Sequence, residues 1–223
     1  DFSFSSDIIL DIIKIGLPAS LSMIVMAVGQ GVFNKILVHI SVETVAAYQV
    51  AGRLDMLVFL PIFSIAASLT TLIGMFYGAK EYEALRFTIR YGIFSALIIT
   101  IFSSATVYIF ADQVVRFFTE DESIVIIAVN FLQIFAFAYP FIAVGITTGR
   151  VLQGLGKGLP VLVITIVRVL GVSAPLSLFF IFVMDKSVEW VWYSMMLSTV
   201  VAFAIGLTWL FSTVKKLPVK NTV

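Results

Sequence analysis

The chain has 223 residues, of which 61% are hydrophobic and 12% are charged, and its formal net charge is +1. Soluble domains carry about 45–50% apolar and about 25% charged residues, so this composition indicates a membrane protein. The small net charge argues against nucleic acid as a partner, and the absence of cysteine excludes disulfides, thiolate metal sites and thiol catalysis.

Apolar stretches long enough to cross a bilayer follow one another along the chain. Each covers the roughly 20 residues that a hydrocarbon core requires, and such long runs are unlike the alternating strands of a membrane barrel. Helices also satisfy their own backbone groups in lipid. We therefore predict an all-α membrane protein, a single bundle of six transmembrane helices at about residues 15–40, 54–77, 91–111, 124–149, 159–184 and 190–214. The segment SSDIILDIIKIGLP, residues 5–18, predicts a short interfacial helix before the first span, capped by Ser6 or Asp7.

Basic residues predict the orientation of these spans. One side collects most of them, namely Lys14, Lys80, Arg86, Arg90, Arg150, Lys157, Lys215, Lys216 and Lys220. The other side has only Lys35, Arg116 and Lys186. By the positive-inside rule, both termini are expected to be cytoplasmic, in a multi-pass protein of the inner membrane. Trp190 and Trp192 are then expected at the outer interface.

The predicted spans contain prolines and closely spaced small residues. Pro18, Pro61, Pro140 and Pro175 lie within or close to the start of a span, where they either permit bending or reflect the frequency of proline in membrane helices. Small residues four apart predict close helix contacts. These pairs are Ala27 with Gly31, Gly145 with Gly149, and Ala202 with Gly206.

The glycine-rich stretch GITTGRVLQGLGKGLP, residues 145–160, first suggests a phosphate loop. A Walker loop would need glycine at Val151 and a hydroxyl at Gly158, and a dinucleotide fingerprint would need glycine at Leu159. Neither spacing is present. The stretch instead predicts a cytoplasmic turn: one helix ends near Gln153, glycines supply positive φ angles, and Pro160 begins the next helix.

Four segments, in this order, resemble the multidrug and toxic compound extrusion (MATE) transporters. They are IGLPASL at residues 15–21, LIGMFYGAKEYEALR at 72–86 with Gly74, Gly78 and Ala79, GRVLQGLGKGLP at 149–160 with Gly154, Gly156 and Pro160, and VRVLGVSAPL at 167–176. The resemblance implies half of a twelve-helix protein that exports small organic cations in exchange for H⁺ or Na⁺ by alternating access. It also implies that the protein is not an enzyme and that it has no cofactor besides the coupling ion, H⁺ or Na⁺.

The loop sequences and the basic tail are more similar to the C-terminal half of that family. The expected partners are then the lipid bilayer and an N-terminal six-helix lobe of the same transporter. Two alternatives stay open. One is a flippase of lipid-linked oligosaccharides or polysaccharides from the same superfamily, and the other is an isolated membrane fragment that does not transport.

The family commonly couples transport to an acidic residue within a helix, and this sequence departs from that pattern. Its first and fourth spans carry Gln30, Asn34, Gln133 and Tyr139 as candidate substrate or cavity-lining residues, and no acid. Asp55 is a weak ion-coupling candidate, with a charge at the outer interface as the alternative. We expect the coupling carboxylate to lie in the other half.

Arg168 is the remaining candidate, because it lies well inside the fifth span. A fixed charge at that depth is unfavourable unless it faces a cavity, a carbonyl or an acid, or extends to the headgroups. We therefore expect Arg168 either to line a cytoplasmic vestibule or to join helices. The sequence shows no His, Asp or Glu cluster with metal spacing and no nucleophile with a base, which argues against an enzyme.

Overall fold

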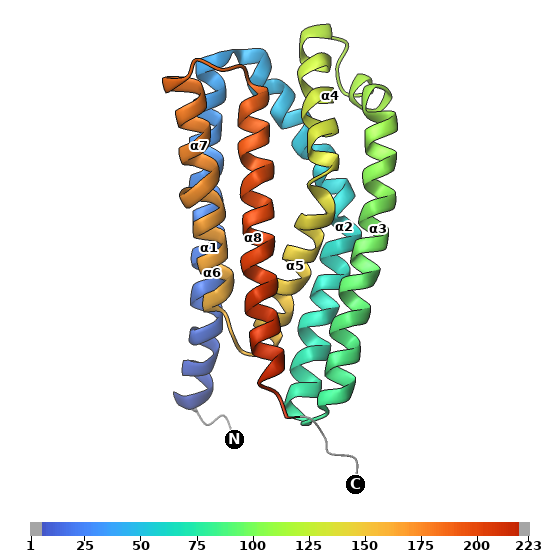
Figure 1. The fold of residues 1–223 in the computed structure, drawn as a ribbon, viewed down its shortest axis with the longest axis vertical. Helices are drawn as coiled ribbons and strands as arrows, with labels where there is room; N and C mark the ends of the chain where they lie inside the picture. The colour runs from blue at the N-terminus through green and yellow to red at the C-terminus, as the bar shows by residue number, and fades with distance from the viewer. Residues whose placement is uncertain (1–5, 219–223) are drawn as a thin grey trace.

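The protein is described by a computed structural model that covers residues 6–218, with the side chains of residues 6–8 and 11 outside the description. In this part of the chain all regular structure is helical, as predicted, and the helices run along one long axis (Figure 1). The first three are α1 (Ser6–Ile40), α2 (Val42–Gly78) and α3 (Tyr82–Arg116). The start of α1 and the end of α8 lie at the same end of the bundle (Figure 1).

The second half of the chain is more segmented. It comprises α4 (Glu122–Ala136), α5 (Tyr139–Gly154), α6 (Leu159–Ile166), η1 (Val167–Ser173), α7 (Ala174–Leu178), η2 (Phe179–Val183) and α8 (Glu189–Lys215), where η1 and η2 are π-helical. Residues Leu159–Val183 continue as one helical rod. Among the described residues, five helices are long and apolar enough to cross a membrane, or six if the bent pair α4 and α5 is one span.

Two expected helix starts are wrong. No separate interfacial helix precedes the first span, because α1 runs unbroken through Pro18, whose carbonyl accepts a hydrogen bond from Ser22 Oγ at 2.8 Å. The proposed cap at Ser6 or Asp7 lies outside the described side chains.

Helix α2 begins at Val42, far before residue 54, because Ser41 caps it by accepting the backbone N–H of Thr44 at 3.1 Å. Asp55 therefore lies several turns inside α2.

The predicted fourth span is broken near its middle. Helices α4 and α5 meet at an angle of 59°, and the break falls at residues 137–138, just before Pro140. Proline lacks an N–H donor and its ring crowds the preceding turn, so a helix bends or ends there. The carbonyl of Ala136, at the end of α4, accepts a hydrogen bond from Ser104 Oγ of α3.

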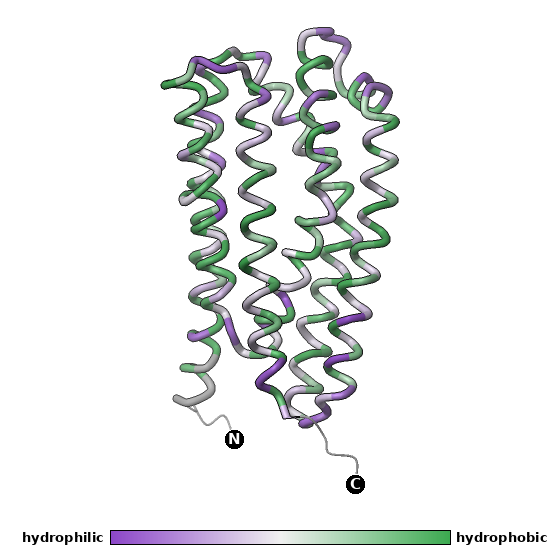
Figure 2. Tube along the Cα trace, viewed as in Figure 1, coloured by the Kyte–Doolittle hydropathy of each residue, from purple (hydrophilic) through white to green (hydrophobic). Residues whose placement is uncertain are grey.

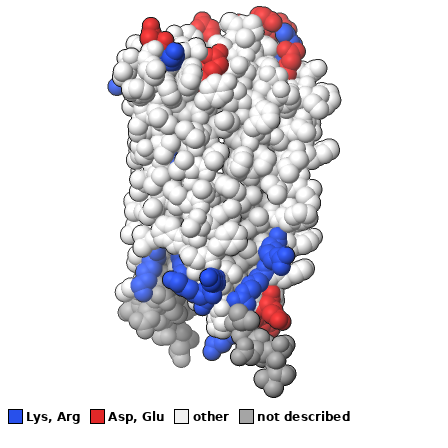
Figure 3. All heavy atoms as spheres, viewed as in Figure 1, with Lys and Arg blue, Asp and Glu red and all other residues white. Residues whose placement is uncertain are grey.

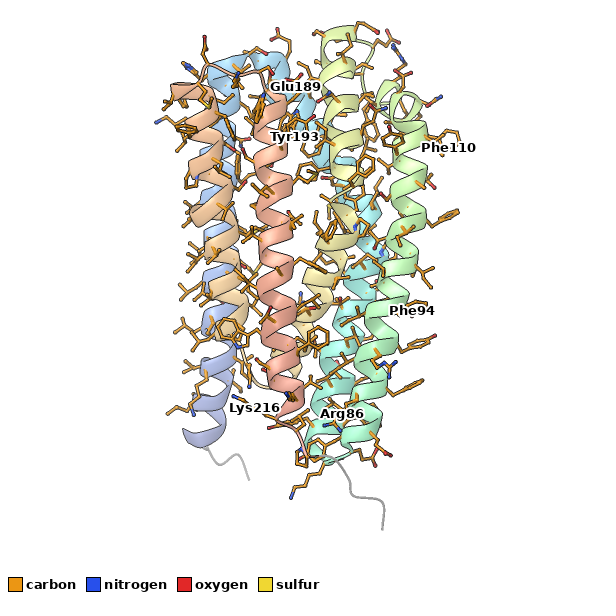
Figure 4. The ribbon with its side chains drawn as sticks, in the orientation of Figure 1. Arg86, Phe94, Phe110, Glu189, Tyr193 and Lys216 are labelled. Carbon is orange, nitrogen blue, oxygen red and sulfur yellow. The ribbon has the colours of Figure 1, made fainter. Side chains whose placement is uncertain are left out.

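Charge and hydropathy divide the molecule into a wide apolar belt and two polar ends. Lys and Arg gather at the end that holds the start of α1, Asp and Glu lie mostly at the opposite end, and apolar residues dominate between them (Figures 2 and 3). On α3, Phe94 and Phe110 point away from the bundle and are 60% and 48% exposed (Figure 4). Aromatic side chains exposed at this level are suited to lipid rather than to water.

One of the two predicted interfacial tryptophans is buried instead. Trp190 is partly exposed, but Trp192 has no exposed surface and packs edge-on against Phe131 at a ring distance of 4.8 Å. It also stacks on Tyr48 at 5.8 Å. Residues two apart on a helix point to different sides, so only one of the pair could face the membrane.

The predicted glycine turn is confirmed. Helix α5 ends at Gly154, Gly156 has a φ of 77°, and Pro160 lies in the first turn of α6. Only Gly156 needs the left-handed conformation. Gly154 is instead required for close packing, since a Cβ there would lie 2.7 Å from the backbone oxygen of Thr70 in α2.

Two motifs that are far apart in the sequence meet at this contact. Gly74 of α2 faces Gly154, because a Cβ on Gly74 would lie 3.6 Å from the Gly154 carbonyl oxygen. Thr70 Oγ1 donates to the carbonyl of Arg150 at 3.3 Å. Gly78 ends α2, and Ala79 caps it with an N–H bond to the carbonyl of Met75 at 2.9 Å. The glycine motifs thus hold α2 against α5.

The predicted small-residue pairs are mostly wrong as close contacts. A Cβ on Gly31 or Gly145 would meet no atom within 4 Å, and on Gly149 or Gly206 it would make only ordinary contacts. The tight position in α1 is Gly29, where a Cβ would lie 2.3 Å from Val169 Cγ1 of η1. Spacing alone does not say which side of a helix faces a neighbour.

We predict that Gly154→Ala destabilises the protein by about 1–3 kcal/mol, because the new methyl group overlaps the α2 backbone, which cannot move aside locally. Gly145→Ala is the matched control in the same helix, with open space around it. It is expected to leave stability unchanged or to raise it by up to about 1 kcal/mol through helix propensity. Thermal unfolding in detergent measures both variants, and equal stability of the two would contradict the packing.

Candidate functional site

Two cavities lie between the helices. The first, which we call the upper cavity, has a volume of about 530 Å³ and is lined from α1, α2, α4, α5, η1 and α8, with Gln30, Asp55, Phe131 and Ser198 among its residues. The second, the lower cavity, has about 330 Å³ and lies toward the basic end, with Ser22, Arg150 and Gln153 among its residues. The cavities share Met26, Ile142, Arg168 and Thr199. They are therefore adjacent along the length of the bundle.

Asp55 is held by a hydrogen bond across the bundle. Tyr139, fully buried at the start of α5, donates its hydroxyl to Asp55 Oδ1. Tyr139 also packs edge-on against Phe59 at a ring distance of 5.3 Å. The partly buried Asp55 thus lines the upper cavity beside the break between α4 and α5.

The polar residues of α1 point toward α2. Gln30 Oε1 accepts a hydrogen bond from the Tyr48 hydroxyl at 3.5 Å, and Asn34 Oδ1 accepts one from Gln49 Nε2 at 3.4 Å. Because Gln30 and Asn34 are four residues apart, they share one helix face, as predicted. Their bonds join the ends of α1 and α2 beside the upper cavity, and Gln30, Tyr48 and Gln49 also line it.

Arg168 lies where the two cavities meet. It lies in η1 and is partly buried, and its Nη2 contacts the Met26 sulfur at 2.9 Å. The side chain of Arg168 lines the wall of both cavities. The close approach of α1 and η1 at Gly29 and Val169 brings the two helices together beside it.

Aromatic rings form one wall of the upper cavity. Phe131 stacks on Phe135 at 4.3 Å and meets the edge of Tyr48 at 5.7 Å, and all three line the cavity. The negative faces of aromatic rings attract cations, and flat cations can also stack on them. This wall is suited to the aromatic part of an organic cation.

The structure brings together only some of the predicted residues. Gln30, Asp55 and Arg168 line the upper cavity, whereas Asn34, Gln133 and Tyr139 line neither cavity. Sequence reasoning missed Tyr48 and the hydroxyls of Ser198 and Thr199 in α8. Tyr48 precedes Asp55 by two helical turns, and this spacing could have placed both on one face had the start of α2 been known.

These features define a helical membrane protein whose bundle encloses polar and aromatic cavities at membrane depth. The MatE family model matches residues 18–179. The chain belongs to this family, whose members are membrane transporters and not enzymes.

Relatives agree with this assignment. The chain is 27% identical over 176 residues to the "Probable multidrug resistance protein NorM" of Thermotoga maritima, covering 79% of this chain and 37% of that protein. It is 24% identical over 215 residues to the protein of that name in Bacillus cereus, covering 94% of this chain and 46% of the relative.

Solved structures share the fold. A MOP superfamily transporter from Pyrococcus furiosus is 29% identical with a TM-score of 0.90, covering 97% of this chain and 49% of that one. An outward-facing multidrug resistance MATE family transporter has the same identity and TM-score, and the match covers 100% of this chain and 50% of the other. The chain thus spans about half the length of the solved transporters that it matches, consistent with one lobe of two.

We predict that Tyr139→Phe destabilises the protein by about 1–3 kcal/mol, since Asp55 loses the hydroxyl donor that joins it to α5. Tyr193→Phe is the control, because Tyr193 is 43% exposed at the acidic end of α8 (Figure 4). Thermal unfolding of single and double variants with Asp55→Ala, which removes the acceptor, isolates the coupling. Additive effects of the two substitutions would show that the pair contributes nothing.

Proposed function

We propose that the chain is the C-terminal lobe of a multidrug efflux antiporter of the inner membrane, which exports organic cations in exchange for H⁺ or Na⁺ by alternating access. The observation that carries the proposal is the upper cavity, where a wall of aromatic rings and a carboxyl side chain lie in one space of about 530 Å³. A cavity of this size and mixed lining is typical of a binding site for a small organic molecule.

The relatives support a transport role, since several of them are named multidrug resistance proteins. The concentration of Lys and Arg at the end where α1 begins supports cytoplasmic termini by the positive-inside rule (Figure 3). Asp55 is the acidic residue that lines the upper cavity, so it remains the candidate of this lobe for the coupling ion. The main coupling carboxylate is expected in the partner lobe.

A flippase of lipid-linked oligosaccharides is the second candidate. Its supporting observation is that three arginines, Arg53, Arg150 and Arg168, line the two cavities against one acid, Asp55. Lipid-linked oligosaccharides carry phosphate groups, which arginine binds well. The aromatic wall favours the drug exporter over this alternative.

Dye efflux from everted vesicles that contain the full-length protein tests the proposal. We expect extrusion of an ethidium-like cationic dye that depends on an imposed H⁺ or Na⁺ gradient and is absent from vesicles containing this lobe alone. The lobe alone lacks half of the alternating pair, so it cannot expose a site to each side in turn.

Two results would contradict the proposal. One is no dye transport by the full-length protein combined with restoration of surface polysaccharide in a flippase-deficient strain, which would establish the second candidate. The other is the absence of a second six-span unit in the native gene, which would leave a membrane module without a transport cycle.

A further inference from the structure

Arg168 lies well inside a helix long enough to span a membrane, and its guanidinium has no ion-pair partner among the described side chains. At a rise of about 1.5 Å per residue, Arg168 lies roughly 14 Å along the rod that begins at Leu159, close to the middle of a core about 30 Å thick. It forms no ion pair with any described side chain, and its hydrogen bond goes to the Met26 thioether, which is a weak acceptor.

The acid that shares the upper cavity already has a partner. Asp55 is held by Tyr139 from the far side, and Tyr48 lies near the charges of both Asp55 and Arg168. The upper cavity therefore carries a carboxyl group and a guanidinium at separate points, each on its own helix, with an aromatic wall beside them. A cavity with two separated opposite charges complements a ligand that carries the reverse pair.

The shape of the guanidinium also selects its ligand. Arginine presents N–H donors in a planar fork that matches a carboxylate with two parallel hydrogen bonds, and such charge-assisted bonds are about twice as strong as neutral ones. Two structural features position the helix segment that carries this fork. Gly29 allows α1 to approach Val169 closely, and the π-helical turn of η1, a form that is frequent at functional sites, carries Arg168.

We propose that Arg168 is an anion-binding residue of the cavity and that it recognises the carboxylate of substrates that also carry a cationic, aromatic part. In this arrangement the aromatic part lies against the Phe131 wall while the carboxylate meets Arg168 at the junction of the two cavities. The inference rests on the proposed export function and assigns a residue of this chain to the anionic group of such substrates. Because Arg168 borders both cavities, it can contact the carboxylate of a substrate in the upper cavity or in the lower cavity.

The test uses two dyes that differ in one group, a cationic rhodamine with a free carboxylate and the methyl ester of the same dye. Full-length protein in proteoliposomes is assayed for transport of each. We expect the unaltered protein to move both dyes and Arg168→Gln to lower transport of the acid about tenfold more than transport of the ester, which corresponds to about 1.4 kcal/mol. Arg168→Lys, which keeps the charge and loses the fork, is expected to show a smaller selective loss.

A control variant is Arg90→Gln, an exposed arginine of α3 that lines neither cavity, and it should leave the ratio of the two rates unchanged. Equal losses for both dyes in the Arg168 variants would overturn the inference and give Arg168 a structural role. Transport of the ester without the acid by the unaltered protein would overturn it too, with the export function intact. Transport of neither dye would overturn both. If Arg168→Gln fails to fold, the selective loss in Arg168→Lys decides.

Discussion

Hydrogen bonding of the backbone inside lipid is the constraint on which this structure depends. No water is available in the hydrocarbon of a bilayer, so each backbone N–H and C=O that faces lipid must find a partner within the protein, and helices meet this requirement. At the break after α4, Pro140 has no N–H to donate to the carbonyl of Ala136, and Ser104 Oγ of α3 donates to that carbonyl instead. The hydroxyl side chain thus satisfies a backbone carbonyl that would otherwise have no donor.

The same scarcity of water governs the charged groups. Asp55 and Arg168 are tolerated in the bundle because cavities and neighbouring side chains surround them. Each lies at an irregular part of the helical structure. Asp55 is beside the break between α4 and α5, and Arg168 is in the π-helical segment η1. Gly29 sets how closely α1 approaches η1 beside Arg168. Packing, irregular helix geometry and charge therefore coincide in one region, which is the reason to look there for substrate binding.

Sequence reasoning predicted the class of fold, the number of apolar stretches and the turn at Gly156 and Pro160, because these depend on local composition and on residue types with narrow backbone preferences. It misplaced the start of α2, since the apolar pattern does not reveal that polar residues after Ser41 continue the helix. Because of that error, sequence reasoning did not recognise that Tyr48 and Asp55 line one cavity. Pairings such as Tyr139 with Asp55 join residues far apart in the chain, and no local pattern contains them.

The central claim is that the face carrying Gln30 borders a water-filled substrate cavity in the full-length transporter, and thiol labelling tests it most directly. The chain has no cysteine of its own, so a cysteine at Gln30→Cys can be compared with one at Phe94→Cys on the lipid-facing side of α3 (Figure 4). Maleimide reacts with a thiolate, which needs water to form. A membrane-impermeant maleimide should label Gln30→Cys, more slowly when a transported dye is present, and leave Phe94→Cys unlabelled. Equal labelling of both, or no protection by the dye, would contradict the account.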